Sequence, residues 1–214
     1  MDLNIDESYY RLNEVLQIME TMSGKAPRRV WIWRKIHLQG LLNYWFWAVA
    51  SCRTNRMAAT ELAQRISDLS QTLDVTYDQD LNSRGISAAV ATYGHMRVCL
   101  RFCSSLADNA FQSSVTEEAA EALVKYRVDN GAWAKNLIDA RNKITAHGDD
   151  ARKMVTSLGS WGTSGDASFT LIDLWTLGPA GASIHLRPDE EIVAMYKYIK
   201  GLVPLLEDCW GISS

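Results

Sequence analysis

The sequence predicts an all-α protein: one domain over residues 1–214, with a helical core over about 4–157, a small β-hairpin and a final helix. Apolar residues recur at three- and four-residue steps through most of that core, which is typical of amphipathic helices. Apolar residues make up 47% of the chain and charged residues 22%, so a substantial core is expected in an ordinary globular protein. No linker separates two cores.

The first half is expected to form three helices. Residues 4–22 place apolar side chains on one face, and "SGKAP", 23–27, ends that helix. Residues 28–52 are apolar nearly all round, which predicts a central helix. Residues 55–73 carry a heptad-like seam of leucine and isoleucine. The polar stretch 74–85 is predicted to be a loop with at most a short helix.

Residues 86–111 predict another long helix. Ser114 and Glu117 have capping-box spacing and open a helix that runs to about residue 128. "DNG", 129–131, is a turn signal, because Gly131 can take a positive φ. The helix that follows is expected to be the return arm of a helical hairpin.

The amino-acid composition changes after residue 158, where glycine and serine become frequent. Two β-prone runs around a "GPAG" turn predict a hairpin over 168–187, which should pack against the helices or a partner because an isolated hairpin is marginal in water. Pro188 and the acids after it open a last helix over 189–210. Pro204 is expected to kink that helix.

Composition limits the classes of function. The net charge is −3, so no global positive field attracts nucleic acid, and any RNA contact must be local. The four cysteines have no CxxC spacing, and Cys99 and Cys103 read as two buried thiols on one helix. The N-terminus lacks the pattern of a secretory signal. These features predict a reduced, cytoplasmic protein without structural zinc.

The most apolar stretch, residues 36–52, is interpreted as a buried helix. It is free of formal charge for only 17 residues and contains several polar side chains, whereas a membrane span needs about 20 mostly apolar residues. Its His37, and His95 further along, read as core histidines. The tryptophans of this region could stack nucleic-acid bases, although the core interpretation is preferred for all four: Trp31, Trp33, Trp45 and Trp47.

The stretch "DARNKITAHGDDARK", residues 139–153, gathers side chains suited to phosphate chemistry. The bare Arg-to-His spacing is common, so its context matters. Gly148 is a natural helix-ending residue, which places His147 at a helix C-terminus, where backbone carbonyls favour the imidazolium. The Arg141 guanidinium can hold two phosphate oxygens at once. Asn142 could donate to a phosphate or orient the imidazole.

Within this stretch, "RNKITAH" resembles the R-x(4–6)-H signature of HEPN domains. The resemblance implies a helical bundle, a homodimer and a metal-independent endoribonuclease that needs no cofactor. It implies that Arg141, Asn142 and His147 of both protomers line a shared cleft. There a ribose 2′-hydroxyl would attack the adjacent phosphate and leave a 2′,3′-cyclic phosphate. The hairpin looks like an elaboration found in abortive-infection-like members.

The charge around the motif is modestly basic. Residues 135–153 hold five cations and three acids, a balance of +2 in a chain of −3. A solvated helix face would look similar. If the cluster meets RNA, its backbone contacts are expected from Lys143, Arg152 and Lys153.

Two interpretations of function therefore compete, with an accidental motif as a third. In the first, the protein is an endoribonuclease that acts as a toxin or an anti-phage defence component, with a cognate antitoxin or another regulatory partner and no association with a membrane. In the second, it is a non-catalytic HEPN-like module that binds a nucleotide or a partner protein. The two predict different behaviour towards RNA.

Overall fold

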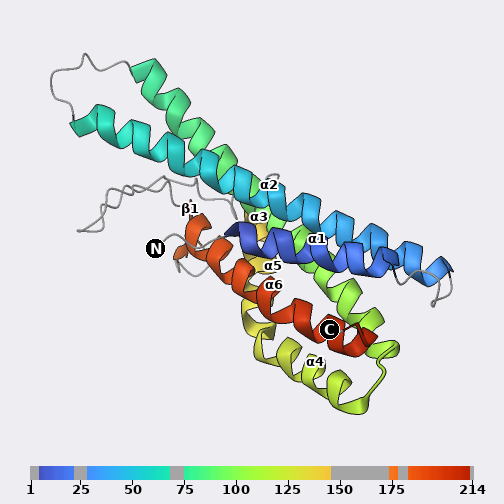
Figure 1. Ribbon diagram of the computed structural model, residues 1–214. Coiled ribbons are helices and arrows are strands. Elements are labelled where there is room, and N and C mark those ends of the chain that lie inside the picture. The colour runs from blue at the N-terminus through green and yellow to red at the C-terminus, as the bar shows by residue number, and fades with distance from the viewer. Residues whose placement is uncertain (1–4, 22–27, 68–74, 146–173, 178–182, 213–214) are drawn as a thin grey trace. The chain divides into compact units, whose positions relative to one another are not determined.

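The computed structural model describes residues 5–21, 28–67, 75–145, 174–177 and 183–212, and these residues are mostly helical (Figure 1). The helical class predicted from the sequence is therefore confirmed. The elements in chain order are α1 (Ile5–Thr21), α2 (Arg28–Ser67), α3 (Val75–Gln112), α4 (Glu117–Asp129), α5 (Gly131–Thr145), β1 (Leu174–Leu177), β2 (Ser183–Leu186) and α6 (Pro188–Trp210).

Two helices are much longer than predicted. α2 runs without a break for 40 residues, so the expected separation between helices at 28–52 and 55–73 is wrong. Thr54 lies at that expected break, and its hydroxyl donates to the carbonyl of Ala50 at 3.0 Å. No glycine or proline stands there, and a polar pair alone does not end a helix.

α3 begins at Val75, so the predicted loop over 74–85 is also wrong. Its polar side chains lie on a helix, where Asp80 and Arg84 form an ion pair one turn apart. Gly85 is buried, and its carbonyl accepts a hydrogen bond of 2.8 Å from the buried Asn55 amide. This contact between α2 and α3 stabilises a helical turn that sequence propensity alone disfavours.

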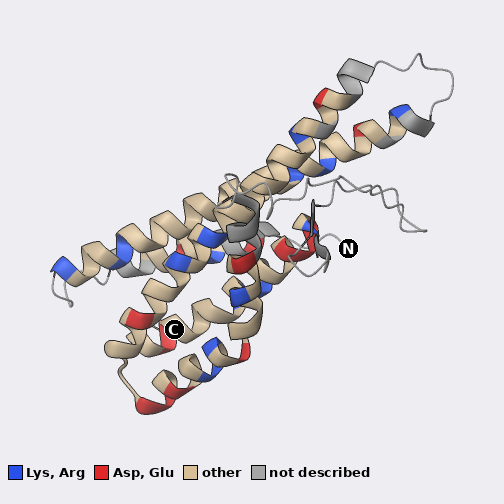
Figure 2. Ribbon diagram, turned by 180° about the vertical axis from the view of Figure 1, so that it is seen from behind, with Lys and Arg blue, Asp and Glu red and all other residues tan. Residues whose placement is uncertain are grey.

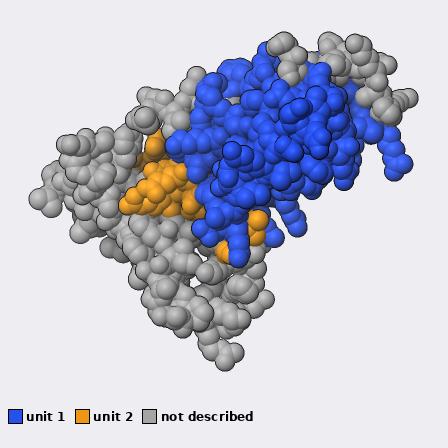
Figure 3. All heavy atoms as spheres, turned by 90° about the horizontal axis from the view of Figure 1, so that it is seen from below, with its two compact units in different colours: residues 1–46, 95–136, 193–214 blue, residues 47–94, 137–192 orange. Residues whose placement is uncertain are grey.

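The chain divides into two compact units, coloured separately in Figure 3. The first contains Met1–Phe46, His95–Asn136 and Val193–Ser214, and the second contains Trp47–Gly94 and Leu137–Ile192. Leu12, Trp45 and Leu106 are among the fully buried side chains of the first unit. Leu81 and Tyr93 are buried in the second. Both units thus contain fully buried apolar side chains.

The tryptophan-rich part of α2 is buried on one side only. Trp45 is 1% exposed, in agreement with the core prediction, whereas Trp47 is 47% exposed and Trp31 and Trp33 are half-buried. Phe46 is 59% exposed. The expectation of a helix buried all round is therefore wrong, because 3.6 residues per turn carry Phe46 and Trp47 away from the face that holds Trp45.

All four cysteines are buried and free, which confirms the prediction of buried thiols for Cys99 and Cys103. Burial raises the pKa of Cys52 to about 11 and that of Cys99 well above its ordinary value. The raised pKa values keep the thiols of Cys52 and Cys99 protonated at neutral pH, which makes them poor nucleophiles.

Thr116, not Ser114, caps α4. The Thr116 hydroxyl accepts from the backbone N–H of Ala119 at 3.2 Å, and Ser114 donates to the Thr116 carbonyl at 2.8 Å. The predicted capping box with Glu117 is wrong because Glu117 is the first helical residue, two positions too early to reach back to the cap.

A single residue, Asn130, separates α4 from α5. Its backbone is right-handed, and its N–H donates to the Tyr126 carbonyl. Gly131 is the first residue of α5. Among the described residues only Gly211 has a positive φ, so Gly131 does not use the freedom that the turn signal suggested.

The described part of the segment 168–187 contains two short antiparallel strands. Leu174 of β1 pairs with Leu186 of β2, and Leu177 pairs with Ser183. That they pack against helices or a partner stays a prediction. α6 follows from Pro188 and places three acids in its first turn, close to the predicted start of the last helix.

Gly201 of α6 allows the close approach of Tyr126. A Cβ at Gly201 would lie 2.5 Å from the Tyr126 hydroxyl, which donates to the Tyr198 carbonyl at 2.8 Å. We expect Gly201→Ala to destabilise the protein by about 1–3 kcal/mol, because the ring must move and lose that hydrogen bond. Urea denaturation measures the change.

Gly94 of α3 provides the matched control, because a Cβ added there would have no neighbouring atom within 4 Å. Gly94→Ala is expected to stabilise the protein by about 0.5–1 kcal/mol through helix propensity alone. Equal effects of the two substitutions would contradict the close contact at Gly201.

Candidate functional site

The predicted site residues fall at and beyond the end of α5. Arg141, Asn142 and Lys143 lie in the last described turn of that helix, where the structure describes the backbone but not these side chains. His147, Arg152 and Lys153 lie outside the described residues. The proposed helix end at Gly148 and the grouping of arginine with histidine therefore stay predictions.

The described part of α5 packs through the side of the helix that carries Trp133 and Leu137. Leu137 is 2% exposed, and Trp133 lies one turn earlier with its ring 5.4 Å from that of Tyr198. Position 141 follows Leu137 by four residues, about one helical turn. The motif therefore begins one turn after a packed part of α5.

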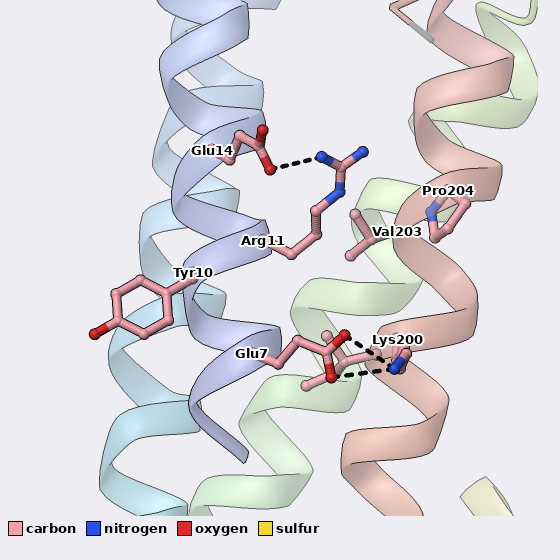
Figure 4. Close-up of a pocket in the computed structure, with 8 residues that line it drawn as sticks. Glu7, Tyr10, Arg11, Glu14, Lys200, Val203 and Pro204 are labelled. Carbon is pink, nitrogen blue, oxygen red and sulfur yellow. Dashed lines mark hydrogen bonds and ion pairs between the residues drawn. The ribbon is translucent and has the colours of Figure 1, made fainter. Parts of the chain in front are cut away.

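A groove of about 590 Å³ separates α1 from α6 (Figure 4). Arg11 stands between two acids: its guanidinium donates to Glu14 at 2.6 Å and to both oxygens of the buried Glu207 at 2.7 and 2.9 Å. These hydrogen bonds raise the pKa of Arg11. The lining residues are Glu7, Tyr10, Arg11, Glu14, Ile199, Lys200, Val203 and Pro204.

The other end of this groove holds a second cluster of charge. Glu7 accepts from the Tyr196 hydroxyl at 2.5 Å and from Lys200 at 3.0 Å, and these contacts lower the pKa of its carboxyl group. Ion pairs at both ends of the groove thus join a residue of α1 to a residue of α6. These ion pairs link α1 to α6, which is a structural role.

A second pocket, of about 400 Å³, lies between the start of α2 and the last turns of α3. It combines an indole, a guanidinium, a hydroxyl, amides and a carboxylate. The lining residues are Arg29, Val30, Trp33, Ser105, Asp108, Asn109 and Gln112. The positive charges at the start of α2 can be followed in Figure 2.

Two side chains behind this second pocket hold its walls in place. The half-buried Arg34 donates from Nε to the Asn109 side-chain oxygen at 2.8 Å and from a terminal nitrogen to Ser113 at 2.7 Å. Its guanidinium also lies 4.7 Å from the Trp210 ring centroid. On the α2 side, the His37 ring stacks on Trp33 with centroids 3.7 Å apart.

The histidines of the described bundle fit structural roles. His37 is half-buried, and its Nδ1 lies 2.8 Å from the Trp33 carbonyl, a distance at which the ring nitrogen donates. Burial lowers the pKa of His95, which favours the neutral ring. The interpretation as core histidines holds only in part, because both rings are half-buried rather than fully buried.

Sequence reasoning did not single out Arg34, Asn109, Arg11 or Glu207. Arg34 and Asn109 are 75 residues apart, and Arg11 and Glu207 are 196 apart. Helical periodicity predicts which residues share a face, but not which faces meet. No local signal would have found these pairs.

No helix in the described ranges has the length and apolarity to cross a bilayer. Within the same residues, no three histidine, cysteine, aspartate or glutamate side chains come together as a metal site. No family model, curated protein or solved structure matches this chain.

Proposed function

We propose that the protein is a HEPN-like, metal-independent endoribonuclease whose active site is completed by a second copy of the chain. The observation that carries the proposal is the "RNKITAH" motif, with Arg141 and Asn142 in the last described turn of α5 and His147 shortly after it. A mostly helical chain agrees with such a protein.

The chemistry explains why two copies are needed. Transesterification requires a base that takes the 2′-hydroxyl proton and an acid that protonates the leaving oxygen. Each chain offers one suitable imidazole, at His147. A two-fold interface would bring two imidazoles together, one neutral and one protonated, and so supply both roles.

Arg141 and Asn142 would act on the phosphate. Negative charge grows on its non-bridging oxygens as the 2′-oxygen attacks, and a guanidinium stabilises that charge with two parallel hydrogen bonds. Asn142 would donate to the same oxygens or orient the imidazole. Lys143, Arg152 and Lys153 would hold the neighbouring phosphates of the strand.

In the cell such an enzyme would act as a toxin or as an anti-phage defence component under the control of an antitoxin. The attack by a 2′-hydroxyl makes RNA, rather than DNA, the substrate. The basic spot is small, so few phosphates would be contacted and binding to RNA should weaken only gradually as salt rises.

Incubation of the purified protein with end-labelled RNA in EDTA tests the proposal. We expect cleavage without divalent metal, products that end in 2′,3′-cyclic phosphate, and no cleavage where a 2′-deoxynucleotide replaces the attacking ribose. Cleavage of that deoxy substrate, or a requirement for Mg²⁺, would contradict the mechanism. Binding of a nucleotide through Arg141 and His147 without any cleavage would favour the non-catalytic module.

A further inference from the structure

We infer that the pocket between α2 and α3 binds one nucleotide unit, by stacking its base on Trp33 and contacting its phosphate through Arg29. The pocket lies wholly within the first compact unit, and none of its lining residues belongs to the 141–147 motif. The inference therefore goes beyond the proposed nuclease function and does not depend on it.

The size and chemistry of the pocket fit a nucleotide. A volume of about 400 Å³ is within the range of small-molecule sites, which is roughly 300–1,000 Å³. Trp33 offers an indole, and stacking of a base on an aromatic ring contributes about 1–3 kcal/mol. His37 is stacked against Trp33 at 3.7 Å, so the indole is held in place before a ligand arrives.

Asn109 supplies a hydrogen-bond donor of fixed direction. Its side-chain oxygen accepts from Arg34 at 2.8 Å, and because an arginine nitrogen can only donate, the amide orientation is set. The Asn109 NH₂ group is consequently turned away from Arg34. An amide in this arrangement can donate to a carbonyl or ring nitrogen on the edge of a base.

The charges around the pocket suit a phosphate group. The acid in the lining, Asp108, is already paired with Arg127 at 2.7 Å. Arg29 is exposed at the start of α2, and residues 28–60 contain no aspartate or glutamate. The guanidinium of Arg29 is therefore the charge that a phosphate would meet, and its planar fork can hold two oxygens at once.

The same chemistry could come from a free nucleotide or from one residue of an RNA strand. Calorimetric titration with 5′-AMP, ribose 5-phosphate and the octamer (rA)₈ in EDTA distinguishes the sources. The His147→Ala protein is used so that the octamer would survive if the chain is a nuclease. An octamer that binds at least about tenfold more tightly than AMP indicates an RNA strand as the ligand. AMP that binds as tightly as the octamer, or more tightly, indicates a free nucleotide.

Two conservative variants test the assigned contacts. Arg29→Gln should weaken binding of AMP or of the octamer by about tenfold, because it removes the charged contact to phosphate. Asn109→Asp should weaken it by about tenfold or more, since the carboxylate keeps an oxygen for Arg34 but loses the donor. Neither change removes a packed side chain, so the melting temperature should be retained.

Matched controls lie on the same unit outside the pocket. Arg101→Gln and Asn43→Asp make the same chemical changes at exposed positions and should leave the affinity within about twofold of its starting value, well short of a tenfold change. Ribose 5-phosphate that binds as tightly as AMP would overturn the inference, because the base would play no part. So would pocket variants that behave like their controls, or the absence of binding by AMP and by the octamer.

Discussion

His147→Ala is expected to slow the cleavage of RNA in EDTA by at least about 10³-fold. A positioned acid or base contributes about 10²- to 10⁴-fold, and in a symmetric dimer one substitution removes both imidazoles. A melting temperature equal to that of the wild-type protein would show that the folded bundle is retained. Single-turnover cleavage of an end-labelled RNA measures the effect.

His185→Ala is the matched control, since it makes the same change in β2, outside the motif. Its rate is expected to stay within about twofold of the wild-type rate, far from the loss that removal of an acid or base causes. Cleavage that continues unchanged in His147→Ala would show that the assigned acid–base role is wrong.

Mixing subunits separates a shared site from one within a single chain. When wild-type protein is equilibrated with an excess of His147→Ala protein, most wild-type chains should enter mixed dimers that have one imidazole. Activity would then fall well below that of the same wild-type concentration alone. Activity that depends only on the wild-type concentration would contradict the composite site.

The helices that were predicted well are those with clear ends. α1 is described to Thr21, shortly before "SGKAP", α4 ends at Asp129, the first residue of "DNG", and α6 begins at Pro188. Proline acts through the backbone itself, so its effect can be read from local sequence, whereas the turn at "DNG" was predicted correctly although Gly131 takes no positive φ. These signals placed three helices without knowledge of any tertiary contact.

The two long helices could not be predicted in the same way. The stretch 74–85 is polar and contains Gly85, yet residues 75–85 are helical because Leu81 is buried and the Gly85 carbonyl accepts a hydrogen bond from Asn55 of α2. Contact with another element outweighed a weak local propensity there. A break in hydrophobic pattern is thus not a break in the helix when no residue forbids the backbone.

The two candidate sites differ in the same way: one is visible in local sequence and the other depends on contacts between helices. Arg141, Asn142 and His147 lie within seven residues, so a local motif could suggest them. The α2–α3 pocket depends on Arg34 meeting Asn109 across 75 residues of sequence. Such a pairing depends on how the helices pack against each other. The spacing of residues within one helix cannot predict it.

Trp45→Ala is expected to cost about 3–5 kcal/mol of unfolding free energy, the largest stability change we expect from one substitution. Trp45 is 1% exposed, and its face of α2 also carries the buried Leu38, Leu41 and Leu42. Removing the indole loses its burial and leaves a cavity that neighbouring helices can fill only in part. Urea denaturation measures the cost.

Phe46→Ala tests whether α2 buries the face that carries Trp45 and exposes the face that carries Phe46. Phe46 is the next residue and is 59% exposed, so its truncation should cost less than about 1 kcal/mol. One residue along a helix turns the side chain by about 100°, and the two variants therefore differ in burial far more than in chemistry. If they destabilised the protein equally, the rotation of α2 about its own axis would be wrong, and with it the position of Trp33 in the nucleotide pocket.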